Sequence, residues 1–295
     1  MHRNKFLSFL LGMVAVFAVG SGSIHPAEAY STLDINSIPK LVIPKSGSQN
    51  IINHSIELEM DSIPTGTAPL FKAKVDIAKE TQTIQEMLNL DHNIEIGSLR
   101  EPSAISRNEF VGLDKSSGRW FYQTDLAYDT GENVPDEKSA IQIAINHIQE
   151  YDIFPADKLG EPRTSELTSG DGIAEPEKVL RRDIIFHPTV DGYEVNGVYR
   201  ICISIGSNGD IVAVEKLASE YERVGDVPLK SESDIENDIV DGNYSLSDAH
   251  YRNNLIATDI DINMYADPES EYIQPVFSIT NNDGDMNILV DAMRR

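Results

Sequence analysis

Residues 199–216 read YRICISIGSNGDIVAVEK, the clearest β-hairpin pattern of the chain. Apolar side chains alternate along residues 201–205, and a second alternating run begins at Ile211. Between them lies the tip 206–210, which contains the dipeptide Asn208-Gly209. Asn-Gly between two alternating apolar runs is the strongest short hairpin signal. The stretch therefore predicts an antiparallel β-hairpin.

The clearest helical pattern of the chain precedes this hairpin. Asp136 stands where it can cap a helix start, and Ile141, Ala144, Ile145 and Ile148 follow at the spacing of one helix face. A strand is predicted over residues 180–186 and another over 193–205, whereas residues 157–177 read as a loop. Residues 131–226 are therefore predicted to form one helix followed by antiparallel strands.

The same order of helix and hairpin occurs on both sides of this unit. In residues 67–130, a strand at 70–75 and a helix at 77–90 precede a hairpin through 110–113 and 120–122. In residues 227–295, Ser231 begins a helix that Gly242 ends, and strands follow at 256–265, 272–280 and 286–290. The sequence thus predicts an α+β fold of repeated helix plus antiparallel β-hairpin units, each sheet packed on a single helix.

Residues 1–29 have the pattern of a secretory signal peptide. Arg3 and Lys5 precede an apolar run over 6–19, and Ala27-Glu28-Ala29 fits a signal peptidase site. Cleavage there would leave Tyr30 as the new terminus, in the periplasm, on the cell surface or in the medium. The apolar run is short for a membrane span, but retention as an anchor stays open. Residues 30–66 are interpreted as an extended leader with one strand near 56–60.

Composition excludes several functions. The chain has a formal net charge of −24, which opposes binding to nucleic acid and to anionic lipid. It also favours solubility and cationic partners, including divalent ions. Cys202 is the single cysteine, so an exported chain has no internal disulfide, and a buried, inert thiol is expected.

Short motifs give the chain a resemblance to known exported proteins. The helix start 137–141, the run VDGYEVNG at 190–197, the strand 201–205 and the tip 208–212 resemble tandem PepSY-like modules. The stretches PLKS at 228–231 and YIQPVF at 272–277 are similar to extracytoplasmic YycI-like regulators of a sensor kinase. The resemblance covers about residues 68–292. It implies a binding protein that inhibits a protease or modulates a membrane sensor, and it supplies no catalytic residue. The YycI-like proteins stay anchored, so a cleaved signal peptide departs from their pattern.

Candidate site residues are few. No catalytic, cofactor or metal motif is expected, since the histidines lack zinc spacing and no Gly-x-Ser-x-Gly elbow occurs. Weak calcium candidates are Asp283 and Asp285 at a hairpin tip and Asp259 and Asp261 along a strand, although a turn and a solvated face explain them better. Trp120 and Tyr122 are candidates for binding a partner, with edge-strand packing as the alternative.

Together these features predict an exported, non-enzymatic binding or regulatory protein of PepSY-like type. Its partner would be another protein or a component of the cell envelope, and not nucleic acid. After signal cleavage the chain would not be an integral membrane protein, and weak binding of divalent cations is compatible with its acidity. The alternatives are an acidic, calcium-dependent cell-surface or adhesion protein and, third, a secreted hydrolase.

Overall fold

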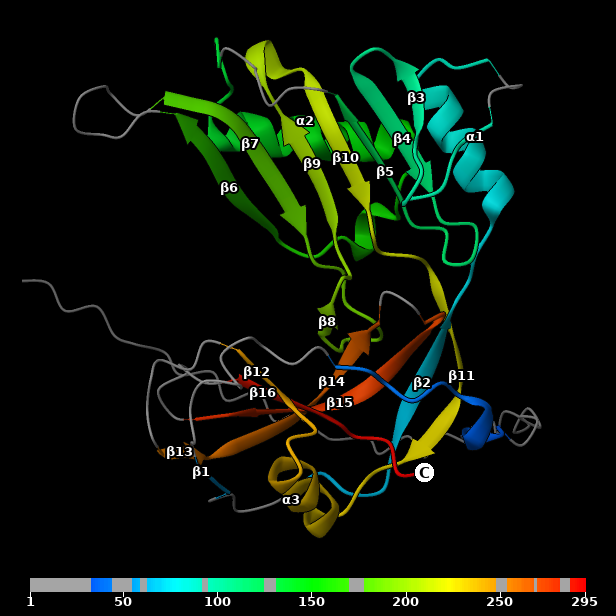
Figure 1. The fold of residues 1–295 in the computed structure, drawn as a ribbon. Coiled ribbons are helices and arrows are strands. Elements are labelled where there is room, and N and C mark those ends of the chain that lie inside the picture. Colours follow the sequence, from blue (N-terminus) through cyan, green and yellow to red (C-terminus); the bar gives the residue numbers. More distant parts are fainter. Residues whose placement is uncertain are drawn as a thin grey trace, which may run out of the picture. The chain divides into compact units, whose positions relative to one another are not determined.

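Strands dominate the computed structural model, which describes residues 33–43, 55–58, 63–91, 95–124, 131–169, 178–247, 254–267, 270–281 and 287–295 (Figure 1). These residues all belong to one compact unit, Leu33–Arg295. In this part of the chain there are sixteen strands and three α-helices, together with short 3-10 turns at Ile35–Ser37, Ala156–Lys158 and Ser207–Gly209. The predicted signal peptide lies outside the described residues.

The first sheet has seven strands and forms around the predicted hairpin. Its order is β3 (Ser103–Ser106), β4 (Glu109–Leu113), β5 (Trp120–Thr124), β10 (Ile211–Lys216), β9 (Ile201–Ile205), β7 (Lys178–Phe186) and β6 (Pro162–Ser169). All neighbours in this order are antiparallel. The β9–β10 hairpin turns at Asn208, whose positive φ of 57° suits Asn and Gly, so this prediction is confirmed.

Two helices pack on one face of this sheet. In α1 (Ile77–Met87) and α2 (Glu137–Glu150), Ile84, Ala144 and Ile148 are fully buried in the same apolar cluster as Trp120 and Ile203. In Figure 1, α2 lies behind the strands.

The start of α2 is predicted correctly, since Asp136 Oδ1 accepts a hydrogen bond of 2.8 Å from the Ser139 amide. Its buried stripe is rotated from the expected one, because Ala140, Ala144 and Ile148 are fully buried while Ile141 and Ile145 are half-buried.

The second sheet combines distant parts of the sequence. Its order is β11 (Tyr221–Pro228), β2 (Thr67–Ala73), β15 (Tyr272–Thr280), β14 (Asp259–Ala266) and β8 (Val195–Gly197); β16 (Asn287–Asp291) also pairs with β15, and β12 (Ser245–Ser247) pairs with β16. The helix α3 (Glu232–Val240) buries Ile235 in the apolar cluster of this sheet. A separate parallel pair joins β1 (Ser55–Leu58) to β13 (Asn254–Ala257).

The predicted α+β fold of repeated units is wrong. β5 pairs with β10, so the first two expected units share one continuous sheet. β2, from the first expected unit, pairs with β11 and β15, from the second and third. The alternation of apolar residues shows that a strand exists, but it does not select a partner that lies far away in the sequence.

Two further strand predictions are wrong. Residues 157–177, read as a loop, contain β6, whose eight residues include none that is buried, so the apolar alternation typical of a strand is absent. The single strand expected at 193–205 is interrupted, because β8 pairs with β14 in the second sheet and β9 with the first. Gly197 ends β8 with a φ of 88°, and the Ala266 carbonyl oxygen lies 2.5 Å from where a Cβ would stand, so a larger residue would clash there.

Candidate functional site

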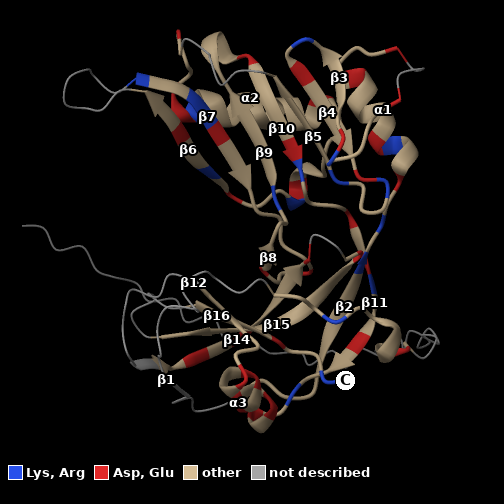
Figure 2. Ribbon diagram, viewed as in Figure 1, with Lys and Arg blue, Asp and Glu red and all other residues tan. Residues whose placement is uncertain are grey.

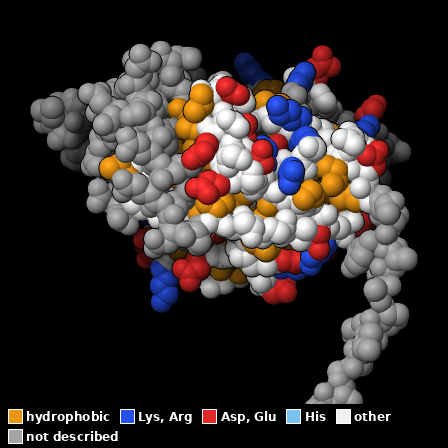
Figure 3. All heavy atoms as spheres, turned by 90° about the horizontal axis from the view of Figure 1, so that it is seen from below, with side chains coloured by type: hydrophobic (Ala, Val, Ile, Leu, Met, Phe, Trp, Pro, Cys, Tyr) orange, Lys and Arg blue, Asp and Glu red, His pale blue; other side chains and the backbone are white. Residues whose placement is uncertain are grey.

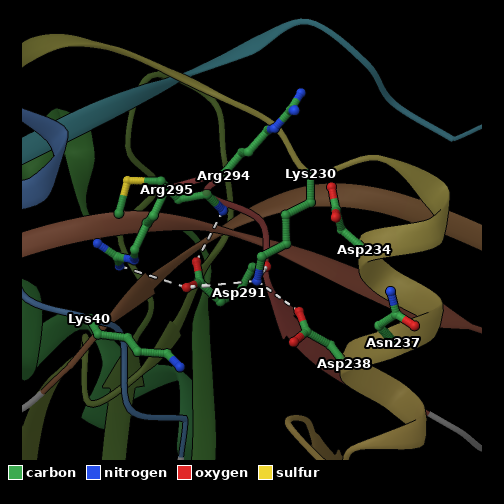
Figure 4. Close-up of a pocket in the computed structure, with 9 residues that line it drawn as sticks. Lys40, Lys230, Asp234, Asn237, Asp238, Asp291, Arg294 and Arg295 are labelled. Carbon is green, nitrogen blue, oxygen red and sulfur yellow. Dashed lines mark hydrogen bonds and ion pairs between the residues drawn. The ribbon is translucent and has the colours of Figure 1, made fainter.

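A charged hollow of about 370 Å³ forms where α3 meets both ends of the described chain (Figure 4). We define the charged hollow by nine lining residues: Lys40, Lys230, Asp234, Asn237, Asp238, Asp291, Met293, Arg294 and Arg295. Lys40 belongs to segment 33–43, Lys230 precedes α3, and the last four follow β16 or end it.

Local sequence explains why these groups meet. Ser231 caps α3 with a reciprocal capping box, in which the Ser231 hydroxyl and the Asp234 carboxylate each accept from the other residue's amide. The backbone beside this cap pairs with the end of the described chain, since the Lys230 amide donates to Ala292 O at 3.0 Å and the Arg294 amide to Pro228 O at 2.8 Å. The cap and this pairing hold α3 against β16.

Asp291 lies at the centre of the charged hollow. Lys230 Nζ donates to Asp291 O and to Asp238 Oδ2, both at 2.7 Å, and lies 3.9 Å from Asp291 Oδ2. Arg295 Nη2 lies 3.7 Å from Asp291 Oδ2, and the Arg295 guanidinium also donates to Ile38 O at 3.1 Å and Pro39 O at 3.2 Å. The cluster thus joins segment 33–43 to α3 and β16.

The charges in the hollow are nearly balanced, with four cationic and three anionic side chains in a chain of net charge −24. Figure 3 shows cationic and acidic side chains together on the face seen from below. The ammonium of Lys230 occupies the space between Asp238 and Asp291 that a cation would need. Within the described residues, no group of three or more His, Cys, Asp or Glu side chains could hold a metal ion. The arrangement is a bridge of ion pairs between segments.

The two aromatic candidates for partner binding lie in the core. Trp120 is fully buried and its Nε1 donates to Glu80 Oε2 at 2.8 Å, while Lys216 Nζ contacts the other oxygen of Glu80. Tyr122 is 8% exposed and donates to Glu109 Oε1 at 3.1 Å. Burial, with the Glu109 charge second, raises the pKa of Tyr122 to about 12. Neither side chain offers an exposed aromatic surface.

The calcium candidates divide into two groups. Asp259 and Asp261 are exposed on β14 and alternate with buried Ile260, as expected for a strand with one wet face. Asp283 and Asp285 lie outside the described residues. Calcium binding at these four positions stays an untested prediction.

The first sheet has a second face that neither α1 nor α2 covers. We call it the helix-free face and define it by Phe110, Phe121, Ile185, Cys202 and Glu215, which register places on the side opposite Trp120 and Ile203. The three larger apolar side chains, Phe110, Phe121 and Ile185, are half-buried.

Cys202, at 9% exposure, is the buried thiol expected from the sequence. Desolvation, followed by the Asp183 and Glu215 charges, raises its pKa to about 12, so it is an inert thiol.

Sequence reasoning missed both regions. The charged hollow unites residues separated by more than 250 positions, such as Lys40 and Arg295, and nothing in either local pattern indicates the other. The signal that could have pointed to the hollow is the basic pair Arg294-Arg295 shortly after an apolar strand. The helix-free face depends on strand order, which the local motifs do not determine.

Comparisons with known proteins find little. No family model and no curated protein matches the chain. One similar solved structure is an uncharacterized protein from Eubacterium rectale ATCC 33656, with 10% identity, a TM-score of 0.35 and coverage of 82% of this chain and 89% of that one. Another is the Bacillus megaterium YpeB C-terminal domain, with 10% identity, a TM-score of 0.30 and coverage of 76% and 100%. Likenesses this weak define neither a family nor a function.

Proposed function

We propose that the protein is an exported, non-enzymatic binding protein of PepSY-like type that modulates a protein partner. The observation that carries the proposal is the helix-free face, a broad antiparallel surface on which Phe110, Phe121 and Ile185 remain half-buried. Aromatic and aliphatic groups among polar ones are typical of the surfaces that proteins use to bind one another. In the described part of the chain, no helix has the length and apolarity to cross a membrane.

The binding role is tested by crosslinking the full chain to its cell-envelope fraction. We expect a protein captured by the natural chain to be lost with Phe121→Ser, because this change removes the central aromatic group of the helix-free face. The matched control is Val240→Ser, since Val240 is 84% exposed at the end of α3 and should leave capture unchanged. Equal loss in both variants, or capture that neither affects, contradicts a role for this face. Circular dichroism shows whether both variants fold.

Export is tested separately by N-terminal sequencing of the protein recovered outside the cytoplasm. The sequence pattern predicts a mature chain that begins at Tyr30. Recovery only in membranes, with residues 1–29 intact, would instead support the anchored form. Hydrolysis of a broad panel of peptide, ester and glycoside substrates, lost on one Ser or acidic substitution, would contradict the non-enzymatic role.

A further inference from the structure

We propose that the outer edge of β6 receives an extended, acidic segment of the partner protein as an added β-strand. This proposal rests on the proposed function, because it names the chemistry of the partner. This inference differs from the proposed function in the surface that makes the contact, which is here the backbone edge of the sheet and there the centre of the helix-free face.

The edge is long and accessible. β6 is the last strand in the order of the first sheet and, within the described residues, pairs with β7 alone. None of its eight residues is buried, and five are exposed. An edge strand presents a row of backbone N–H and C=O groups that an extended peptide can pair with. Pro162, which lacks an amide hydrogen, is confined to the first position.

Positive charge exceeds negative charge on the β6–β7 hairpin. Of the five basic residues on the strands of the first sheet, four lie on β6 and β7, namely Arg163, Lys178, Arg181 and Arg182. The same two strands carry two carboxylates, Glu166 and Asp183, which form ion pairs with Arg182 and Arg181 and leave a net charge of +2. The fifth, Lys216, is buried against Glu80. Figure 2 shows blue segments on both strands of the β6–β7 hairpin, with red ones among them. In a chain of net charge −24, a local excess of cations attracts an acidic partner.

The register of β6 and β7 places the side chains that could contact an added strand on one face of the sheet. Arg163 stands opposite Ile185, and Leu167 stands opposite Arg181, so all four share the helix-free side. The Arg163 side chain is exposed and forms no ion pair with any described residue, whereas Arg181 Nε lies 2.8 Å from Asp183 Oδ1. Leu167, four residues along β6 from Arg163, is 39% exposed. A strand added beside β6 would place an acidic side chain next to Arg163 and an apolar one next to Leu167 on this side.

The probe is a labelled heptapeptide in which Glu alternates with Thr and Val, and binding to the full mature chain is followed by fluorescence anisotropy. We expect the peptide to bind at least tenfold more tightly than a Lys-for-Glu version. We also expect N-methylation of alternate amides to abolish binding, because backbone pairing then fails. Arg163→Glu should weaken binding at least tenfold and Arg163→Lys much less. The matched control Lys115→Glu, at a side chain that is 65% exposed on another loop, should have no effect.

Several outcomes would overturn the proposal. Equal binding of the Glu and Lys peptides excludes charge recognition, and binding that survives N-methylation excludes an added strand. Absence of binding by any peptide means that the edge charges only prevent self-association. If an envelope protein is captured but Arg163→Glu leaves capture unchanged, this inference fails while the proposed function stands. If the peptide binds but no envelope protein is captured, the proposed function fails, whereas the ability of the β6 edge to bind an acidic strand stands.

Discussion

At the residue scale, the core of the first sheet contains a buried polar cluster of three side chains, Glu80, Lys216 and Trp120. Glu80 comes from α1, Lys216 from the end of β10 and Trp120 from the start of β5. Lys216 is 4% exposed, and desolvation lowers its pKa despite the opposing charge of Glu80. A buried ion pair contributes little net stability, but removing one partner leaves a buried charge uncompensated.

We therefore expect Lys216→Ala to lower the free energy of unfolding by about 3–5 kcal/mol, because the Glu80 carboxylate loses its counter-ion. The double variant Lys216→Met with Glu80→Gln should be far less damaging, since no charge stays buried and the new side-chain carbonyl can still accept from Trp120 Nε1. Urea unfolding of both variants makes the comparison. As a control, Lys115→Ala, at an exposed pair, should change stability by less than about 0.5 kcal/mol. A loss below about 1 kcal/mol for Lys216→Ala would show that water reaches Glu80.

His147 provides a pH-dependent prediction. Burial lowers its pKa below the ordinary value of 6.5, with Glu150 opposing, and its ring lies 5.0 Å from that of Tyr151. As pH falls through 6.5, His147 in the unfolded chain takes up a proton while the folded one resists, so stability falls until the lower folded pKa is reached. Above about 7, both states are neutral and the dependence disappears.

We expect the urea midpoint of the natural chain to fall from pH 7.5 to 5.5 by more than that of His147→Gln. The same midpoints measured at pH 7.5 and 9 should differ equally in both proteins. Parallel pH profiles between 7.5 and 5.5 would show that His147 titrates alike in the two states.

At the scale of elements, α2 shows how a helix orients its apolar stripe. Ile148 and Ile145 have the same chemistry and lie one turn apart, yet Ile148 is fully buried and Ile145 half-buried. The small residues Ala140 and Ala144 lie in the same stripe as Ile148 and bring the helix close to β7 and β9.

Ile148→Ala should therefore cost about 2–5 kcal/mol of unfolding free energy, as for a full core position. Ile145→Ala should cost clearly less, because part of its side chain already contacts water. Chemical denaturation of the two variants under identical conditions checks the order. A larger loss for Ile145→Ala would mean that the stripe expected from the sequence alone is the correct one.

The helix caps and the hairpin tip show which parts of the fold the sequence could predict, and the packing of α2, the strand β6 and the charged hollow show which parts it could not. The cap at Asp136, the hairpin tip at Asn208 and the capping box at Ser231 follow from local chemistry, and each lies where the pattern indicates. The rotation of α2 depends on the sheet beneath it. β6 was missed because its exposed edge lacks an apolar face, and the charged hollow was missed because Lys40 and Arg295 meet only after folding.

At the scale of the whole molecule, segment 33–43 packs against the second sheet. Ile38 is 3% exposed and packs with Leu70, Val227 and Met293, and Leu41 is 5% exposed beside Val276. Gln274 Nε2 donates to Pro39 O at 3.1 Å, and Arg295 donates to the same carbonyl. The segment interpreted from the sequence as part of a leader is thus packed here as a strap.

Leu41→Ala should accordingly lower the free energy of unfolding by about 2–5 kcal/mol. Its neighbour Val42, which is 69% exposed, is the matched control, and Val42→Ala should change stability by less than about 0.5 kcal/mol. Thermal unfolding of the chain that begins at Tyr30 measures both. Equal, small effects would show that the strap packs only loosely.

The acidity of the chain allows a last prediction. Asp259 and Asp261 are exposed and need no particular ion, so calcium and magnesium at matched ionic strength should shift the melting temperature equally. A site dedicated to calcium would add a specific stabilisation by mass action. Melting curves in chelator, calcium and magnesium decide between them. A calcium-specific rise of several degrees, lost with Asp283→Asn or Asp285→Asn, would support the calcium-dependent surface protein.

The pairing of β2 has a consequence for the order in which the chain is made. β2, at Thr67–Ala73, needs β11 at Tyr221–Pro228 and β15 at Tyr272–Thr280 as its neighbours. Almost the whole polypeptide must therefore leave the ribosome before Leu70 and Phe71 can be covered. Contacts between such distant parts of a sequence form slowly, and uncovered strands aggregate. The chain should thus depend on a holding chaperone until β11 and β15 are free to pair with β2.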